Sequence, residues 1–198
     1  HPLGAPLHKA EFPAPYPLMA GGVVPSGAPM NIGMLGMHGC YTSTRAVADC
    51  DVLIAVGSRF SDRVALNPKT FAKNATIIQI DIDPSELGKN VDVDLSITGD
   101  AAYVLKAMLP QIAEKKHPDW MRMIREWQAQ DYHPVSDASC LMPHQVIGEV
   151  CNQCGPEAVY VTDVGQHQMW AAATPPTGRW QSAMCSSRWA PAFPTAWR

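Results

Sequence analysis

Three short segments of the sequence carry residue types that suit the binding of a nucleotide. GMLGMHG (33–39) offers one imidazole and several glycines, which let a backbone approach a ligand closely. GSRFSDR (57–63) carries two arginines, whose guanidinium groups can pair with phosphates. DID (81–83) supplies carboxylates of the kind that bind a ribose hydroxyl. Together the segments predict a dinucleotide cradle that lacks the GxGxxG turn.

Each of these segments alone has a simpler interpretation. Arg59 and Asp62 could form an ion pair, and His38 could be a satisfied loop histidine. The position of the segments argues for binding, because ligands of open α/β sheets lie outside the carboxyl ends of the strands. Three such segments after successive elements therefore favour a nucleotide site.

The elements that must position these segments form half of a doubly wound sheet. DVLIAVG (51–57) and TIIQIDI (76–82) are continuous apolar runs, typical of parallel strands that are covered on both faces. The residues between them (58–75) are long enough for a crossover with a short helix. The predicted fold class is α/β, with a doubly wound, mostly parallel sheet.

Helix signals follow the second of these strands. Asp83 is placed as an N-cap, with Pro84 at the first helical position and Glu86 two residues later. After a further strand in VDVDLSITGD, Asp100 is predicted to cap a helix over 101–115.

A second α/β unit is predicted after a charged linker. The linker (116–140) contains one expected helix, and an amphipathic helix follows over 142–154. AVYVTD (158–163) reads as a buried strand that leads through VGQHQMWAA into another helix. Gln166 and His167 stand where that strand end meets a helix N-terminus, which is an anion-binding position.

Composition excludes several classes of protein. The 198 residues suffice for one or two domains, and a net charge of −3 gives no reason to expect nucleic acid or an anionic membrane as a partner. No apolar run approaches the roughly 20 residues of a membrane span. Six cysteines are too sparse for a disulfide scaffold, and the lone CxxC pair (151–154) lacks the second ligand pair of a zinc site. A cytoplasmic location is expected by default.

The segments NIGMLGMHG, CDVLIAVGSRFSDRV, FAKNATIIQIDIDPSELGKN and VTDVGQHQMWAA together resemble the large catalytic subunit of acetolactate synthase (acetohydroxyacid synthase), a thiamine-diphosphate enzyme. Their order and spacing agree over roughly residues 21–173. The resemblance implies a three-domain enzyme: the first domain supplies a catalytic glutamate, the middle domain binds FAD, and the last binds thiamine diphosphate and Mg²⁺. It also implies a homodimer or higher oligomer, with a regulatory small subunit as a further partner.

The reaction that this resemblance implies is a transfer between 2-oxo acids in branched-chain amino acid biosynthesis. Pyruvate loses CO₂ and is joined to a second pyruvate or to 2-oxobutyrate, while the FAD does no redox chemistry. Two alternatives stay open. The parent could be a sister thiamine-diphosphate enzyme of the sulfoacetaldehyde acetyltransferase or pyruvate oxidase type, or the chain could be a non-catalytic nucleotide-binding domain.

Residue by residue, the resemblance implies FAD contacts in the three segments and just after them. These are Leu35, Gly36, Met37, His38, Gly57, Ser58, Arg59, Phe60, Ser61, Asp62, Arg63, Val64, Asp81, Ile82, Asp100 and Ala101. Gln166 and His167 match the loop that meets the thiamine diphosphate phosphates, and Ser61 departs from the acidic residue that is frequent in the family. No catalytic residue and no metal ligand is carried over, because the glutamate domain and the Gly-Asp-Gly magnesium segment find no match. No catalysis is expected from this chain alone.

The resulting division of the chain has five parts. Residues 1–20 match the family poorly, 21–115 form the FAD-binding-type domain, 116–140 the linker, and 141–173 the start of the thiamine-diphosphate domain. Codons allowed for RWAPAFPTAW, read one base earlier, can encode a Met-Gly-Ala-Gly-Phe-Pro run like that of the family. We therefore predict that 174–198 is an irregular, out-of-frame tail and that 141–173 is the least stable folded part.

Overall fold

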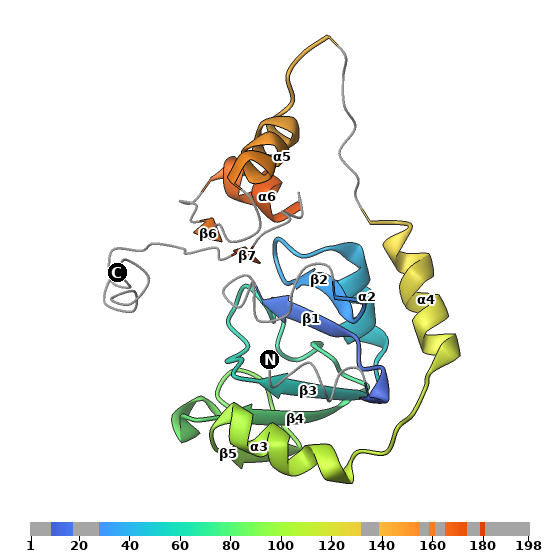
Figure 1. Ribbon diagram of the computed structural model, residues 1–198. Coiled ribbons are helices and arrows are strands. Elements are labelled where there is room, and N and C mark those ends of the chain that lie inside the picture. Colours follow the sequence, from blue (N-terminus) through green and yellow to red (C-terminus); the bar gives the residue numbers. More distant parts are fainter. Residues whose placement is uncertain are drawn as a thin grey trace.

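The computed structural model describes six parts of the chain (Figure 1), which are residues 9–17, 28–131, 139–154, 159–160, 165–173 and 179–180. All strand pairs within these parts are parallel. The prediction of an α/β fold with parallel strands is confirmed. None of the helices in these parts is long and apolar enough to cross a membrane.

Three strands form the centre of the largest described part. They are β3 (Val52–Val56), β4 (Thr76–Asp81) and β5 (Leu95–Thr98), and they agree closely with the predicted apolar runs. β4 lies in the middle, with backbone hydrogen bonds to both neighbours. Because the three strands are parallel, their carboxyl ends lie at one edge of the sheet.

The two faces of this sheet are covered by different segments. Successive side chains of a strand point to opposite faces. On one face Ala55 and Ile77 pack with Phe60 and with alanines of the β3–β4 crossover. On the other face Ile80 is completely buried, and α3 (Ala101–Met108) packs against β4.

The β3–β4 crossover departs from the sequence prediction. Residues 58–75, all of them described, form turns and bends in place of the predicted short helix. The Asn67 carbonyl accepts from the N–H groups of Thr70 and Phe71 at 3.1 and 3.0 Å, which begins a turn. Ala72 then has a φ of +46°, which a right-handed helix cannot continue through. Burial of Ala72 in the core offsets that backbone cost.

Both predicted helix caps are confirmed. Asp83 Oδ1 accepts from the Ser85 N–H at 2.9 Å, at the start of the short 3₁₀ helix η2 (Pro84–Glu86). Asp100 Oδ1 accepts from the Tyr103 N–H at 3.0 Å, at the start of α3. Each cap satisfies a backbone N–H that has no partner within its helix.

α3 is shorter than the predicted run 101–115. It ends at Met108, and the 3₁₀ helix η3 (Leu109–Gln111) follows. Pro110 explains the difference, since proline removes a backbone donor and clashes with the preceding helical turn.

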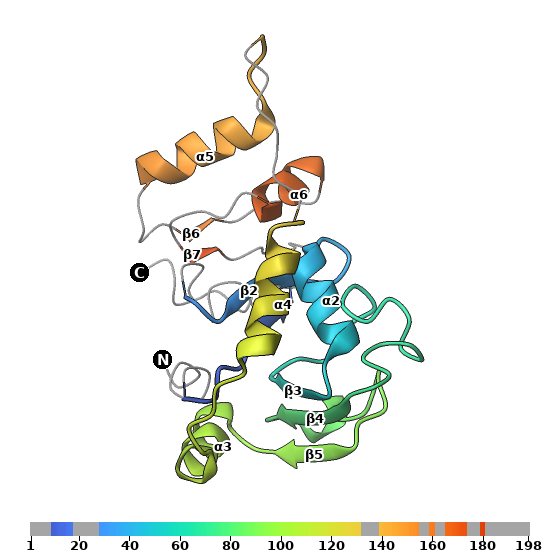
Figure 2. The same cartoon turned by 90° about the vertical axis from the view of Figure 1, so that its right-hand side faces the viewer.

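Two further strands and two helices pack together beside this sheet. β1 (Ala14–Pro17) pairs with β2 (Asn31–Leu35), and α2 (Tyr41–Asp49) follows β2. α4 (Pro118–Gln128) runs alongside α2 (Figure 2). α4 is the one helix that was expected in the linker, and it packs onto the central unit. β1 lies in the N-terminal segment that the resemblance matches poorly.

A small hydrophobic cluster holds α4 in this position. Ile32 of β2 and Ala46 of α2 pack against Ile124 and Trp127 of α4. The Trp127 ring also meets the Arg45 guanidinium, 5.7 Å from the ring centroid. Apolar burial at Ile124, which is 0% exposed, is the main stabilising contribution here.

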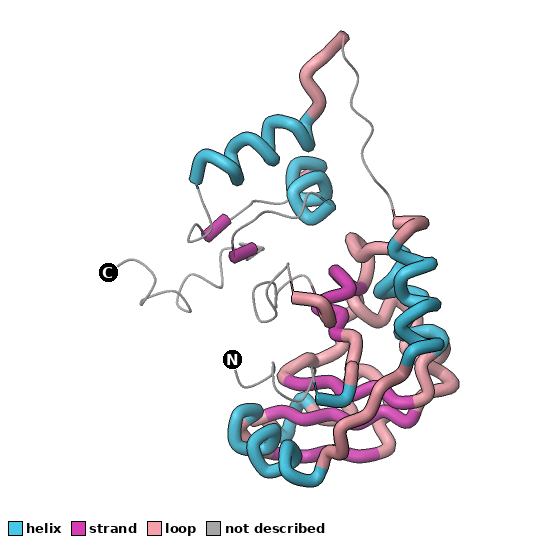
Figure 3. Tube along the Cα trace, turned by 45° about the vertical axis from the view of Figure 1, so that its right-hand side comes forward, coloured by secondary structure: helices cyan, strands magenta, loops and turns pink. Residues whose placement is uncertain are grey.

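The described residues between 139 and 180 form two helices and a two-stranded ladder (Figure 3). α5 (Pro143–Cys154) and α6 (Gln166–Ala173) agree with the predicted helices and pack on each other. β6 (Val159–Tyr160) pairs with β7 (Arg179–Trp180). β7 therefore departs from the irregular tail that the sequence predicts, and the remainder of that tail lies outside the described residues.

Candidate functional site

Backbone hydrogen bonds tie the three predicted binding segments together. The Met37 N–H donates to the Arg63 carbonyl at 2.7 Å, which joins the loop after β2 to the loop after β3. The Gly57 N–H donates to the Ile80 carbonyl at 2.8 Å, at the shared end of β3 and β4. The segments thus meet at the carboxyl edge of the sheet, where ligands of open α/β sheets bind.

Two glycines shape the backbone at this edge. Gly36 has a φ of +104°, and a Cβ there would lie 2.3 Å from the Arg63 carbonyl oxygen. Glycine is therefore required at this position for the loops to touch. Gly57 also has a positive φ, +61°, but a Cβ there would meet no described atom within 4 Å. The surface beside Gly57 is open to a ligand.

The Arg59 loop is anchored by an aromatic residue with an uncommon backbone conformation. Phe60 has a φ of +47°, which is unfavourable for a bulky non-glycine residue. Its ring is 4% exposed and packs edge to face on Phe71, with 5.4 Å between the centroids. The buried ring thus compensates the backbone strain, while Arg59 and Asp62 on either side stay exposed.

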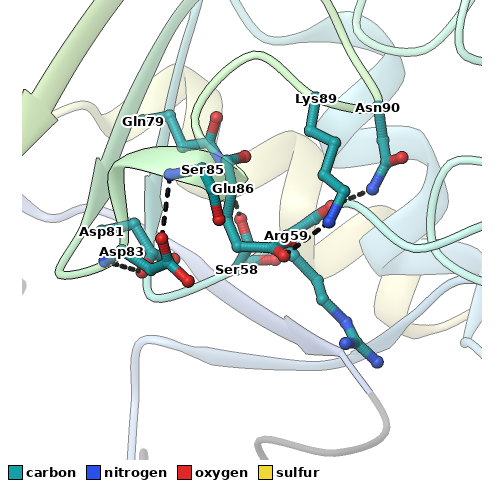
Figure 4. A network of polar contacts seen from close by, with 9 residues as sticks. All are labelled: Ser58, Arg59, Gln79, Asp81, Asp83, Ser85, Glu86, Lys89 and Asn90. Carbon is teal, nitrogen blue, oxygen red and sulfur yellow. Dashed lines mark hydrogen bonds and ion pairs between the residues drawn. The ribbon is translucent and has the colours of Figure 1, made fainter.

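Carboxylates follow the end of β4, as the DID motif predicts. Asp81 Oδ1 accepts from the Asp83 N–H at 3.0 Å. Hydrogen bonds from the Ser85 side chain and backbone lower the pKa of Asp83 below its usual value, so Asp83 is charged at neutral pH. Glu86 Oε1 pairs with Lys89 Nζ at 2.7 Å (Figure 4).

Two buried polar atoms at this edge have no hydrogen-bond partner among the described residues. They are His38 Nδ1 and Glu86 Oε2, and the remaining such atom in the described ranges is Arg45 Nε. Met37 and Ile82 are 56% and 70% exposed at the same edge. A buried polar atom without a partner is costly. A bound ligand with polar groups and an apolar ring would satisfy the polar atoms and cover the apolar side chains, so these residues fit a flavin nucleotide.

Glu86 is a candidate ligand contact that sequence reasoning missed. The sequence marks it only as the third residue of a helix start. Its significance lies in the burial of Oε2, which depends on how η2 folds back toward the loop after β3. No spacing in the sequence carries that signal.

The remaining predicted residues lie at the ends of elements or in the Arg59 loop, and their positions do not indicate a specific ligand contact. Leu35 ends β2, and the Asp100 carboxylate caps α3, of which Ala101 is the first residue. The Gly99 N–H donates to the Asp81 carbonyl at 2.9 Å, which holds this cap next to the end of β4. Ser58, Ser61 and Val64 are half-buried in the Arg59 loop.

The predicted thiamine diphosphate contacts belong to α6 and not to the strand-end loops. Gln166 and His167 are the first two residues of α6 and are both exposed. They stay a prediction. Across the described residues, no cluster of three or more His, Cys, Asp or Glu side chains could hold a metal ion.

A groove of about 450 Å³ lies elsewhere, between α4 and the residues before β2. It is lined by Glu11, Met30, Met121 and Ile124, among others. It contains none of the predicted site residues, so it is separate from the strand-end site.

Comparison with known families identifies the central unit. Residues 5–108 match the thiamine pyrophosphate enzyme central domain. The chain belongs to the thiamine pyrophosphate enzyme family. The matched range runs from before β1 to the end of α3, so it contains all the predicted strand-end segments.

Similar curated proteins are acetolactate synthases. The acetolactate synthase large subunit of Cyanidium caldarium is 41% identical over 172 residues, which cover 82% of this chain and 29% of that protein. Acetolactate synthase of Mycobacterium leprae is 41% identical over 170 residues, 81% of this chain and 27% of that protein. The isozyme 1 large subunit of Escherichia coli K12 is 36% identical over 172 residues, 86% of this chain and 31% of that protein. The chain spans about three tenths of the length of these relatives.

Proposed function

We propose that this chain is the FAD-binding central part of an acetolactate synthase large subunit. The observation that carries the proposal is the meeting of three loops at one sheet edge, with two buried polar atoms there that have no described partner. The names of the similar proteins support the acetolactate synthase assignment.

The residues at this edge of the sheet would contact different parts of FAD, according to their chemistry. Arg59 and Arg63 provide positive charge for the diphosphate. His38, Asp81 and Glu86 offer polar atoms to hydroxyl and N–H groups, and each carboxylate accepts such bonds. The exposed Met37 and Ile82 side chains offer apolar surface to the ring systems. FAD has no redox role in this proposal. When bound, it stabilises the edge of the sheet.

In the complete protein, we propose the condensation of two 2-oxo acids with loss of one CO₂. Thiamine diphosphate would supply the nucleophilic carbon for this reaction, and Mg²⁺ would neutralise charge on its diphosphate. Gln166 and His167 would meet that diphosphate at the start of α6, where helix N–H groups favour an anion. A homodimer or higher oligomer and a regulatory small subunit belong to the same proposal.

The alternatives that the sequence left open are less well supported. The three similar proteins described above are all named acetolactate synthase, which favours that function over a sulfoacetaldehyde acetyltransferase or a pyruvate oxidase. A non-catalytic nucleotide-binding domain would share the FAD site but not the start of a second unit at α5 and α6.

Titration of the full chain with FAD tests the proposed site. Arg59→Ala should weaken FAD binding by at least roughly tenfold, because a hydrogen bond between charged groups contributes about 1.5–3 kcal/mol. Arg122→Ala is the matched control, since Arg122 is exposed on α4 and pairs only locally with Asp119. Flavin fluorescence would report both affinities. Equal affinity of the two variants would remove Arg59 from the site, and no flavin binding by the unchanged chain would overturn the proposed function.

The assignment to acetolactate synthase needs a separate assay. The complete parent protein, supplied with pyruvate, thiamine diphosphate, Mg²⁺ and FAD, should form acetolactate. Formation of acetyl phosphate or of no product would favour another member of the family.

A further inference from the structure

A buried glutamine links the two loops that border the candidate site. Gln79 lies on the central strand β4 and is 1% exposed. Its Nε2 donates to the carbonyls of Ser58 and Glu86 at 3.0 and 3.1 Å, and its Oε1 accepts from the Gly88 N–H at 2.9 Å. Burial of an amide is unfavourable unless the amide is bonded, and these three bonds offset that cost.

The bonded groups come from two different loops. Ser58 belongs to the loop after β3, which carries the arginines, whereas Glu86 and Gly88 belong to the turn after β4. Asn90 adds a parallel link, since its Nδ2 donates to the Arg59 carbonyl at 2.7 Å (Figure 4). Two side-chain amides from the β4–β5 segment therefore hold two consecutive carbonyls of the arginine loop.

This arrangement has an electrostatic consequence. A peptide carbonyl carries partial negative charge, so a carbonyl that faced a phosphate would repel it. The two amides hold the carbonyls of Ser58 and Arg59 on the side of the β4–β5 segment. Figure 4 shows the Arg59 guanidinium directed away from Glu86 and Lys89. The loop thus separates its negative and positive groups, which prepares one side for an anion.

We propose that Gln79, assisted by Asn90, is a positioning residue that fixes the Ser58–Arg59 backbone for recognition of the FAD diphosphate. The proposal rests on the proposed function, because it assigns a phosphate to the side of the loop that Arg59 occupies. It predicts that substitution of either amide weakens binding of a flavin that carries the diphosphate, and does not weaken binding of flavins in general.

The test compares FAD with riboflavin, which has the same ring system and ribityl chain but lacks the diphosphate and the adenosine beyond it. The full chain and three variants are titrated with each ligand by flavin fluorescence. Gln79→Met preserves the size of the side chain but removes all three hydrogen bonds. It should weaken FAD binding by roughly tenfold or more, as expected for lost bonds to buried backbone groups, and leave riboflavin binding unchanged.

Asn90→Asp covers the case in which Gln79→Met does not fold. Asn90 is exposed, and the substitution replaces its amide donor by a carboxylate that faces the Arg59 carbonyl. A selective loss of FAD affinity, of several-fold or more, is expected. Asn67→Asp is the matched control: Asn67 is exposed in the crossover, and its Oδ1 only accepts from the Lys69 N–H, which an aspartate also does.

The outcomes separate the two proposals. If the unchanged chain binds FAD and Gln79→Met or Asn90→Asp binds it equally well, the positioning role is overturned while the proposed function stands. If FAD and riboflavin affinities fall together, these amides are merely structural, which also overturns the positioning role. If the unchanged chain binds no FAD, the proposed function fails and this inference fails with it.

Discussion

The sheet around β4 and the α5–α6 unit place their candidate binding residues in very different settings. In β4, Ile77, Gln79 and Ile80 are 5%, 1% and 0% exposed, and both neighbouring strands bond to it. In α5 the one buried residue is Cys151, and Val146 and Val150 are 45% and 49% exposed. The strand-end loops therefore rest on a packed core, whereas α6 packs on α5, a helix with one buried residue.

The difference shows what a preorganised site requires. A loop holds its side chains in place only when the elements beneath it are rigid. The arginine loop is fixed by Phe60 in the core, by Gln79 from the strand below and by the Met37–Arg63 bond. Gln166 and His167 have exposed side chains. They follow Gly165, and glycine restricts the backbone less than other residues do.

The largest expected effect is the difference in stability between a substitution in the central sheet and one in α5. Ile80→Ala should lower the free energy of unfolding of the central unit by about 2–5 kcal/mol, because it leaves a cavity beside α3. Val150→Ala in α5 should change stability by less than about 0.5 kcal/mol, since Val150 is exposed. Urea denaturation of each full-chain variant, followed by circular dichroism, measures both. Similar costs for the two substitutions would contradict the contrast between the regions.

The next effect concerns the two glycines of the site. Gly36→Ala should destabilise the central unit by at least about 2 kcal/mol, because its Cβ would collide with a backbone carbonyl that cannot move aside. Gly57→Ala should cost about 1–2 kcal/mol, which is the ordinary penalty of a left-handed alanine in open space. Thermal unfolding of both variants gives the difference. If Gly57→Ala is the more damaging, the loop contact at Gly36 does not hold the structure together.

A smaller effect tests whether α4 belongs to the central unit. Thr42 at the start of α2 donates its N–H and its Oγ1 hydroxyl to the two oxygens of Asp131, at 2.9 and 2.7 Å. Asp131→Ala should therefore cost about 1–2 kcal/mol, as expected for a lost helix cap. Asp119→Ala, which breaks an exposed pair with Arg122, should cost less than about 1 kcal/mol. Equal melting temperatures would mean that α4 is the simple linker that its composition suggests.

The sequence predicted the elements whose signal is local. Continuous apolar runs predicted β3 and β4 to within a residue or so, and the aspartate caps of η2 and α3 were read correctly. α5 and α6 were found by their periodicity and by the glycine before α6. These features depend on neighbouring residues only.

The elements that were missed depend on tertiary packing. α2 contains Thr42, Ser43 and Thr44, which are weak helix formers, and it is stabilised by burial and by Asp131. β1 contains prolines, which argue against a strand, and it forms by pairing with β2.

The residues of the candidate site also fall into those that the sequence predicts and those that it does not. The glycine, arginine and aspartate segments were visible because their residue types are chemically specific. The roles of Gln79 and Glu86 were not visible, because a buried polar atom is recognised only when the surrounding loops are in place.

The smallest effect compares cysteines from the two regions. Cys50, at the end of α2, is half-buried, and its thiol donates to the Val47 carbonyl at 3.4 Å. Burial raises the pKa of Cys50 from 9.0 to about 11. Above about pH 9 the Cys50 thiol loses its proton in the unfolded chain but keeps it in the folded state. The free energy of unfolding therefore falls as the pH rises from about 9 to about 11. At pH 8 the reactive thiolate of Cys50 is therefore scarce.

Alkylation of the full chain with iodoacetamide at pH 8, read by peptide mass spectrometry, measures this contrast. Cys140 and Cys154 are exposed, so they should be labelled well before Cys50, whose thiolate is scarce and partly covered. In guanidinium chloride all three should react at similar rates, since the folded environment is then gone. Fast labelling of Cys50 in the folded chain would mean that the end of α2 opens readily, and the central unit would then lack the rigidity that the strand-end site requires.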